Sequence, residues 1–271
     1  MPPILCYHKV ETKLELGVTR LSPRRFARQM ERLAKAGWRT IGLADVAAGL
    51  RGERGLGARE LAITFDDAYR GLRDHAFPVL ESLGFSATCF VITEFAGRLN
   101  RWDVAYGGRR FAHLAWRDMR RWQSRGVEFA SHTATHPRLT WLSDRDVARE
   151  MSASRAAIRH ALDVAPGAIS YPFGAQTDRE RVLAAEAGYA CGVALAGVDR
   201  PGVMAMERLP VYPWSPPTPA VGPLRGIERL GAIGANRCAV GTTLWQRACR
   251  SRMDAEDART AIPNFDGEPL G

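Results

Sequence analysis

Short apolar runs alternate with segments of helical hydrophobic spacing through most of the chain. Runs rich in β-branched and aromatic residues predict strands, and these runs cover residues 4–7, 61–65, 87–92, 127–130, 168–171, 190–194 and 208–212. Strands that alternate with helices predict an α/β protein whose parallel sheet is covered by helices. About seven such units favour a closed or nearly closed barrel, and an open doubly wound sheet is the alternative.

The segments between these runs carry helix boundaries. Ser22 has the position of an N-cap before Pro23, and Gly37 follows the end of that helix. Ser143 and Asp146 resemble a capping box at the start of another helix. Glycines follow three further helical stretches, where a left-handed residue is expected, at positions 84, 126 and 188.

The pattern changes near the C-terminus. We predict a barrel domain over residues 1–214 and a Pro/Gly-rich tail or appendage over residues 215–271, because Ser-Pro-Pro-Thr-Pro continues neither a helix nor a central strand. Within the barrel domain, residues 95–115 have the composition of a long functional loop.

The bulk composition narrows the class of protein. No apolar run approaches the roughly 20 residues of a membrane-spanning helix, and the N-terminus lacks the features of a secretory signal. We therefore expect a cytoplasmic protein, with the inner membrane face as a further location. The five cysteines form no Cys-x-x-Cys pair, which argues against a disulfide scaffold or a cysteine-based zinc site.

The chain is basic, with a net charge of +9 and a pI near 9.8. The excess charge is spread along helical segments, without the aromatic-interleaved stripe or helix-turn-helix signature of a nucleic-acid-binding protein. We expect no nucleic-acid partner. A basic surface favours anionic partners, such as a phospholipid face or a polyanionic substrate.

Two acids, Asp66 and Asp67, stand where a predicted strand ends. Neighbouring side chains on an extended chain point to opposite sides, so one carboxylate can bind a metal while the other meets a reacting water. Taken alone, such a pair more often forms a turn with its side chains bonded to nearby amides.

Two histidines, His132 and His136, follow the strand predicted at 127–130. At a spacing of four residues they share one face of a helical turn and can bind one ion, whereas a pair of exposed histidines is the plain alternative. With Asp67 they form a two-His-one-carboxylate set with open positions, which is typical of a catalytic metal site. Asp66 is then the adjacent candidate for the general base.

Further candidates follow other strands. His8 follows the first strand, and the Pro-x-Gly turn of Tyr171-Pro172-Phe173-Gly174 can aim a backbone N–H at an oxyanion. A lone histidine is more often structural, but the loops after the strands of a (β/α) barrel build its active site. The remaining histidines, His75, His113 and His160, are interpreted as solvent-facing.

The motifs Thr64-Phe65-Asp66-Asp67, His132-Thr133-Ala134-Thr135-His136-Pro137 and Tyr171-Pro172-Phe173-Gly174 resemble those of polysaccharide deacetylases, the NodB-homology family of carbohydrate esterases. The resemblance implies a distorted (β/α) barrel, one divalent ion that is commonly Zn²⁺, and hydrolysis of the amide C–N bond of N-acetylglucosamine-type residues. It implies that Asp66 is the base, that Asp67, His132 and His136 are the metal ligands, and that the Phe173 amide contributes to the oxyanion site. Tyr171, Pro172 and Trp102 are expected to bind the N-acetylated glycan.

Two positions depart from the common family pattern. Ser170 stands where many members have an arginine that orients the catalytic aspartate. The late Leu-x-His that supplies the general acid is also absent, and Leu5-Cys6-Tyr7-His8 resembles the N-terminal version of a subgroup with permuted motifs. His8 is therefore the candidate general acid.

Two other functions remain open from the sequence. The chain can act on a small amide or on a lipid-linked glycan in place of a polysaccharide. It can also be a catalytically inactive carbohydrate-binding module that stacks sugars on Trp102, Trp116 and Trp141, although an intact Asp–His–His set argues against that.

Overall fold

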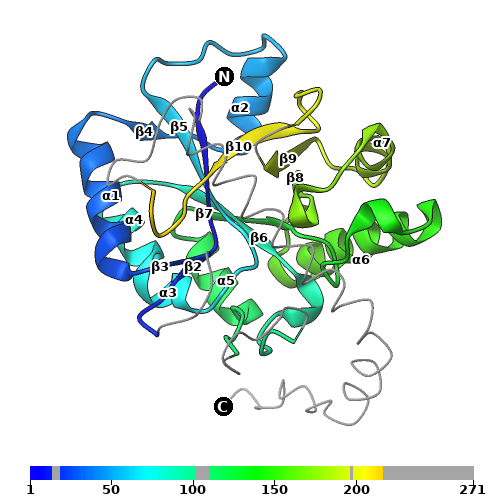
Figure 1. The fold of residues 1–271 in the computed structure, drawn as a ribbon, viewed down its shortest axis with the longest axis horizontal. Coiled ribbons are helices and arrows are strands. Elements are labelled where there is room, and N and C mark those ends of the chain that lie inside the picture. The colour runs from blue at the N-terminus through cyan, green and yellow to red at the C-terminus, as the bar shows by residue number, and fades with distance from the viewer. Residues whose placement is uncertain (14–18, 102–109, 196–197, 216–271) are drawn as a thin grey trace.

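The fold is seen in a computed structural model, which describes residues 1–13, 19–101, 110–195 and 198–215. Seven parallel strands form a closed ring (Figure 1). Around the ring they are β1 (Ile4–Tyr7), β5 (Glu60–Phe65), β6 (Ala87–Val91), β7 (Val127–Ser131), β8 (Ala168–Ser170), β9 (Cys191–Leu195) and β10 (Met206–Pro210). β1 closes the ring because it pairs with β5 on one side and with β10 on the other. The predicted barrel is confirmed, and the open sheet is wrong.

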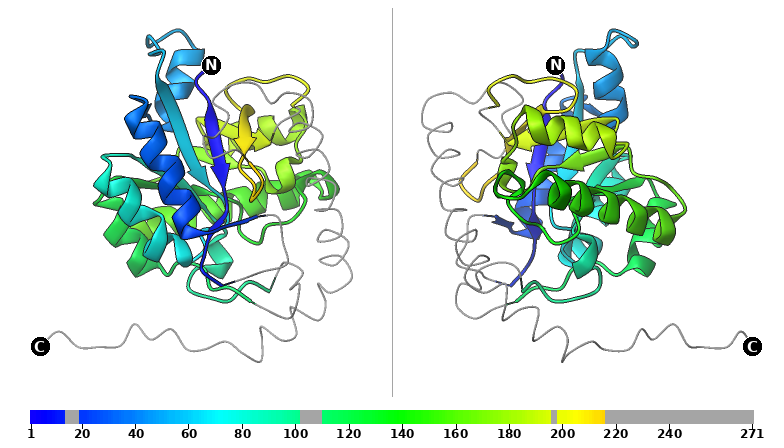
Figure 2. Two further views of the ribbon diagram at one scale, coloured as in Figure 1. Left: turned by 60° about the vertical axis from the view of Figure 1, so that its left-hand side comes forward. Right: turned by 90° about the vertical axis from the view of Figure 1, so that its right-hand side faces the viewer.

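Helices surround the ring (Figure 2). They are α1 (Pro23–Lys35), α2 (Leu43–Leu50), α3 (Gly71–His75), α4 (Phe77–Ser82), α5 (Trp116–Gln123), α6 (Asp144–Leu162) and α7 (Asp178–Glu186), with short 3₁₀ turns η1 (Thr93–Phe95), η3 (Leu139–Trp141) and η4 (Pro172–Gly174). None of the helices in the described ranges has the length and apolar composition needed to cross a bilayer.

Three short strands lie outside the predicted set. β2 (Lys9–Val10) pairs with β3 (Arg20–Leu21), and β4 (Arg39–Thr40) pairs with the first two residues of β5. Their two-residue length leaves too little periodicity to predict. The last barrel strand also begins earlier than predicted, at Met206.

The predicted helix boundaries are confirmed. Pro23 opens α1, and the Ser143 hydroxyl accepts a hydrogen bond from the Asp146 amide at the start of α6. Positive φ values follow the helical segments at Gly37 (76°), Gly84 (67°), Gly126 (90°) and Gly188 (91°), a conformation that costs glycine little.

The barrel interior is apolar at one end. Strand residues such as Ile4, Phe90 and Met206 pack there, and α2 closes that end with Leu43 and Val46. Since α2 lies near the start of β1 (Figure 1), the apolar end is the one at which the strands begin, and the end at which they finish is left for polar side chains.

The three cysteines in the described part of the chain, Cys6, Cys89 and Cys191, are free and buried, as expected of small apolar residues. Cys238 and Cys249 lie outside the described residues, as does nearly all of the predicted tail at 215–271. The domain boundary at 214 stays a prediction.

The close approach of β9 to its neighbour gives a stability prediction. A Cβ at Gly192 would lie 2.5 Å from the Met204 carbonyl oxygen and 2.8 Å from the Tyr171 hydroxyl. We expect Gly192→Ala to lower the free energy of unfolding by about 1–3 kcal/mol, as measured by denaturant titration. Gly167→Ala is the matched control, because nothing lies within 4 Å of its new methyl group. Equal stability of the two variants would contradict the prediction.

Candidate active site

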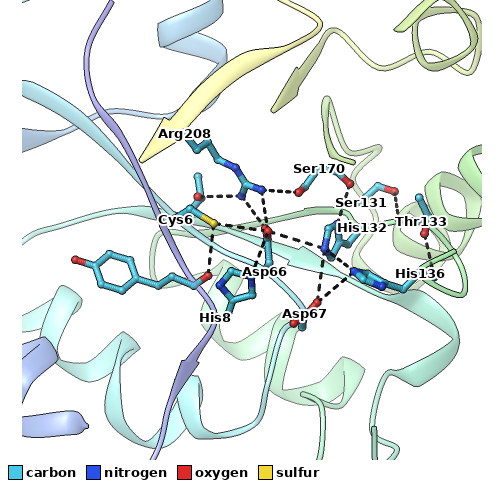
Figure 3. Close-up of polar contacts among 12 residues, drawn as sticks. Cys6, His8, Asp66, Asp67, Ser131, His132, Thr133, His136, Ser170 and Arg208 are labelled. Carbon is cyan, nitrogen blue, oxygen red and sulfur yellow. Dashed lines mark hydrogen bonds and ion pairs between the residues drawn. The ribbon is translucent and has the colours of Figure 1, made fainter. Parts of the chain in front are cut away.

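The predicted site residues converge at the ends of the strands (Figure 3). His8 follows β1, Asp66 and Asp67 follow β5, and His132 and His136 follow β7. All five side chains reach the open end of one barrel, and four of them are at least 95% buried, with His8 somewhat more exposed.

Three of these side chains form a compact triangle of ligand atoms. The Asp67 Oδ1 atom lies 3.6 Å from His132 Nε2 and 3.7 Å from His136 Nε2, and the two Nε2 atoms are 3.2 Å apart. Tetrahedral zinc ligands at their usual bond lengths lie about 3.4 Å from one another. The set therefore fits one divalent ion with a position left for water or substrate.

The two imidazoles are presented by an irregular loop, so the helical turn predicted from their spacing is wrong. Thr133 and His136 both have positive φ, at 67° and 61°. The Thr133 hydroxyl accepts a hydrogen bond from the His136 amide, which fixes the turn. Thr135 instead binds the buried Glu150 of α6 through both its amide and its hydroxyl.

A hydrogen bond from the second ring nitrogen fixes how His132 faces the ion position. His132 donates from Nδ1 to the Ser170 carbonyl oxygen at 2.8 Å, which leaves Nε2 as the ligand atom. Burial lowers the pKa of His132 and the pKa of His136, so both rings are neutral at pH 7. Neutral imidazoles are the form that binds a metal.

The two aspartates separate because the chain leaves the extended conformation between them. Asp67 and Ala68 have φ values of 69° and 52°. The buried His113 holds this turn, because its Nδ1 donates to the Asp67 carbonyl oxygen at 2.6 Å and its ring stacks on Tyr69. The interpretation of His113 as solvent-facing is therefore wrong.

Asp66 is held by an arginine that belongs to none of the three sequence motifs. The Arg208 guanidinium donates to both carboxylate oxygens of Asp66 at 2.7 Å, and it also reaches the Ser170 hydroxyl at 2.9 Å. Arg208 comes from β10 and is fully buried. The orienting arginine thus comes from a different strand, and Ser170 supports it.

This contact decides the charge of Asp66. Burial alone raises the pKa of a carboxyl group, but the charge of the adjacent Arg208 and, after it, His132 hold the pKa of Asp66 well below its usual range. Asp66 is consequently ionised at pH 7.

His8 lies on the other side of Asp66. Its Nε2 atom is 4.0 Å from Asp66 Oδ2, and 18% of its side chain remains exposed. Burial lowers the pKa of His8 to about 4, against the opposing effect of the Asp66 charge. The ring is therefore neutral at pH 7, and its Nε2 atom lies close enough to the Asp66 carboxylate for a proton to pass between them.

The turn after β8 contributes the remaining predicted site residues at this end of the barrel. Phe173 has a φ of 60°, and its ring packs edge-on against His136 at 4.7 Å between centroids. The Tyr171 side chain is fully buried and donates its hydroxyl to the Met204 carbonyl oxygen, and Pro172 is also buried. Substrate contacts by Tyr171 and Pro172 stay predictions, and Trp102 lies outside the described residues.

Comparison with known proteins agrees with this arrangement. The family model described as polysaccharide deacetylase matches residues 53–192, which is more than half of the chain. The protein YxkH of Bacillus subtilis, which carries the name of a polysaccharide deacetylase, is 27% identical over 214 residues, covering 78% of this chain and 71% of its own length.

Two solved structures share the fold. The deacetylase PplD of Streptococcus pyogenes, solved with acetate, is 24% identical with a TM-score of 0.69, over 80% of this chain and 96% of its own. IcaB of Ammonifex degensii is also 24% identical, with a TM-score of 0.68, over 86% of this chain and 96% of its own.

The Arg208–Asp66 pair gives a prediction about stability and pH. Arg208→Met leaves a buried carboxylate without its partner, so we expect the free energy of unfolding at pH 7 to fall by about 3–5 kcal/mol. The pKa of Asp66 rises in this variant, because the charge that lowered it is gone and burial remains. The stability gap to the wild type should therefore narrow as the pH falls through the raised pKa of Asp66 in the variant, because protonation neutralises the buried carboxyl group there. In the wild type Asp66 stays ionised, and its contribution to stability declines only below the pKa of about 4 of an unfolded aspartate, as the unfolded state takes up the proton.

Denaturation curves at several pH values test this. The matched control is Asp66→Asn combined with Arg208→Met, which should be more stable at pH 7 than Arg208→Met alone. A gap that does not change with pH would mean that Arg208 contributes packing and not charge.

Proposed function

Because the chain belongs to the polysaccharide deacetylase family, we propose that it removes N-acetyl groups from N-acetylglucosamine-type residues of a polysaccharide or lipid-linked glycan. The observation that carries the proposal is the triangle of Asp67, His132 and His136 beside an ionised Asp66. A binding module has no need of a buried carboxylate held ionised next to a set of metal ligands.

Asp67, His132 and His136 would hold a divalent ion, with Zn²⁺ expected from their one-oxygen, two-nitrogen donor set. When bound, such an ion supplies Lewis acidity, which polarises the acetyl carbonyl and makes water more acidic.

Asp66 acts as the general base. Its carboxylate lies within 4 Å of both His132 and His8, between the ion position and the general-acid candidate. The bidentate contact with Arg208 fixes the direction of its lone pairs. The same contact lowers the pKa of Asp66 and so makes it a weaker base. Asp66 is therefore suited to accept a proton from water that has already become more acidic.

His8 acts as the general acid after it has received a proton. It is neutral at rest, and a proton taken up by Asp66 has only about 4 Å to travel to the His8 ring. His8 then donates this proton to the nitrogen of the leaving amine. Leaving the amine protonated prevents it from attacking the acetyl carbon again.

The Phe173 amide is the remaining candidate. The left-handed conformation of Phe173 turns the backbone of η4 beside His136. From there, its N–H can donate to the oxyanion that forms on the acetyl oxygen. The contact with an anionic membrane face and the cytoplasmic location stay predictions.

The first test concerns the base. Asp66→Asn keeps the size of the side chain but removes the proton acceptor, so we expect it to retain the divalent ion and to lose at least about 100-fold in kcat. Acetate release from chitin oligosaccharides and metal content by mass spectrometry measure the two effects. Full activity of Asp66→Asn with its metal bound would show that Asp66 is not the general base.

The second test concerns the ligands. His132→Ala removes one corner of the triangle, so we expect it to lose its divalent ion on dialysis and to release no measurable acetate. The control is His160→Ala, because His160 is exposed on α6 away from the site. An unchanged metal content in His132→Ala would show that the ion is bound elsewhere.

Release of acetate from small amides but not from glycans would mean that the substrate is a small amide, while the assignment of the site residues would stand.

A further inference from the structure

A second group of ligand-type side chains lies beside the predicted metal ligands. The ligand atoms of Cys6, His8 and Asp66 all lie within 4.8 Å of one another, and Asp66 Oδ2 is 3.9 Å from His132 Nε2. The proposed mechanism uses His8 and Asp66 but gives no role to the Cys6 thiol. A thiolate, an imidazole and a carboxylate are the side-chain groups that bind Zn²⁺ in proteins. The three residues therefore form a mixed set of metal-binding groups.

The local sequence explains why these side chains face one another. Cys6 and His8 are two residues apart at the end of β1, and side chains at this spacing leave an extended chain on the same side. The Tyr7 side chain between them points to the outside of the barrel, where its hydroxyl donates to the Gln29 side chain of α1. The Asp66 amide donates to the Tyr7 carbonyl oxygen at 2.9 Å, which holds the end of β5 beside the end of β1.

The separations between the ligand atoms suit one ion. The Cys6 Sγ atom lies 3.7 Å from Asp66 Oδ2, and His8 Nε2 lies 4.0 Å from the same oxygen (Figure 3). Sulfur, nitrogen and oxygen ligands at their usual bond lengths around a tetrahedral zinc ion lie about 3.3–3.6 Å apart. Modest rotations of the Cys6 and His8 side chains would therefore close the set. The His8 side chain is partly exposed, so an ion can arrive from solvent on that side.

This set binds an ion more weakly than the first one does. Both Asp66 oxygens already accept hydrogen bonds from Arg208, whose positive charge opposes a further cation. Each carboxylate oxygen nevertheless keeps another lone pair. Burial raises the pKa of the Cys6 thiol well above its usual range, so the thiol has to release its proton as the metal–sulfur bond forms. A second ion is therefore expected only when metal is in excess over the first site.

We propose that Cys6, His8 and Asp66 form a second, inhibitory site for a divalent ion with affinity for sulfur, such as Zn²⁺ or Cd²⁺. The ion binds the Cys6 sulfur, the His8 Nε2 atom and one Asp66 oxygen, and the thiol proton leaves to water. The binding rests on this geometry alone, whereas the inhibition rests on the proposed function. A bound ion occupies the lone pairs that the general base and the proton carrier need, so it stops turnover while the first ion stays in place.

The binding test uses Cd²⁺ and Zn²⁺ as probes. An ion held by Asp67, His132 and His136 has no sulfur ligand, so cadmium–thiolate absorption in the ultraviolet reports binding to a cysteine. Cys6→Ser keeps the size of the side chain and removes the sulfur, and Cys6→Ala is the second variant in case a buried hydroxyl destabilises the fold.

Cys191→Ser is the matched control. Cys191 is also free and buried, but it packs in the apolar cluster at the opposite end of the barrel. The other cysteines are common to all the variants, so their signal cancels in the comparison. We expect the wild type and Cys191→Ser to bind one more Zn²⁺ per chain in equilibrium dialysis than Cys6→Ser does, and to show cadmium–thiolate absorption that Cys6→Ser lacks.

The inhibition test measures acetate release from chitin oligosaccharides with one equivalent of Zn²⁺ and with graded excess. Each rate is divided by the rate of the same variant at one equivalent, which removes any effect of the substitution on turnover itself. We expect the excess of Zn²⁺ that halves the rate to be at least about tenfold higher for Cys6→Ser than for the wild type, because one of three ligands is lost. Cys191→Ser should be inhibited like the wild type.

The outcomes separate this inference from the proposed function. If Cys6→Ser and Cys6→Ala bind as many ions as the wild type and give the same cadmium–thiolate absorption, the second site is wrong and the proposed function stands. If the second ion binds but acetate release is unchanged or rises, the inhibition is wrong. If the wild type with one equivalent of Zn²⁺ releases no acetate from any glycan, the proposed function and the inhibition fail together, and the ion count still decides whether the second site exists.

Discussion

The closure of the barrel by β1 is the constraint on which the site depends. β1 hydrogen-bonds to β5 and to β10, so it stands between the strand that carries Asp66 and the strand that carries Arg208. This pairing brings residues from the start, the middle and the end of the barrel domain within contact distance of one carboxylate. Closure also leaves no open sheet edge among the seven strands.

The negative charge of Asp66 is balanced by a buried cation at the mouth of the barrel, the end where the strands finish. A buried carboxylate without a partner would be protonated or would destabilise the fold. Arg208 removes that penalty and leaves Asp66 ionised, while the neighbouring histidines are neutral because they are buried. One fixed cation therefore keeps Asp66 ionised, and the neutral rings keep the nitrogen lone pairs that can bind a metal. The same balance explains why Ser170 is adequate at its position: it has only to accept a hydrogen bond from Arg208.

Backbone strain is concentrated at the mouth. Of the described non-glycine residues with positive φ, Asp67, Ala68, Thr133, His136 and Phe173 all lie in the site loops, and Asp163 at the end of α6 is the exception. Such conformations cost about 1 kcal/mol or more each. They persist because the surrounding contacts determine them, from the His113 ring on one loop to Glu150 on another. The strain turns consecutive residues in different directions, so that Asp66 binds Arg208 while Asp67 faces His132 and His136.

The sequence by itself determined the seven barrel strands, the helix caps and the candidate ligands, because periodicity, capping residues and motif spacing are local properties. Asp66, Asp67, His132 and His136 were found in this way, although the helical turn expected for the histidines was wrong, since the spacing of four residues fits several backbone paths. Arg208, His113 and Glu150 had no such signal. Arg208 reads as one charged residue in a strand, and its role appears only when the ring closes and β10 comes within reach of β5 across β1. Tertiary structure decided these contacts because the groups that balance a buried charge come from segments far apart in the chain.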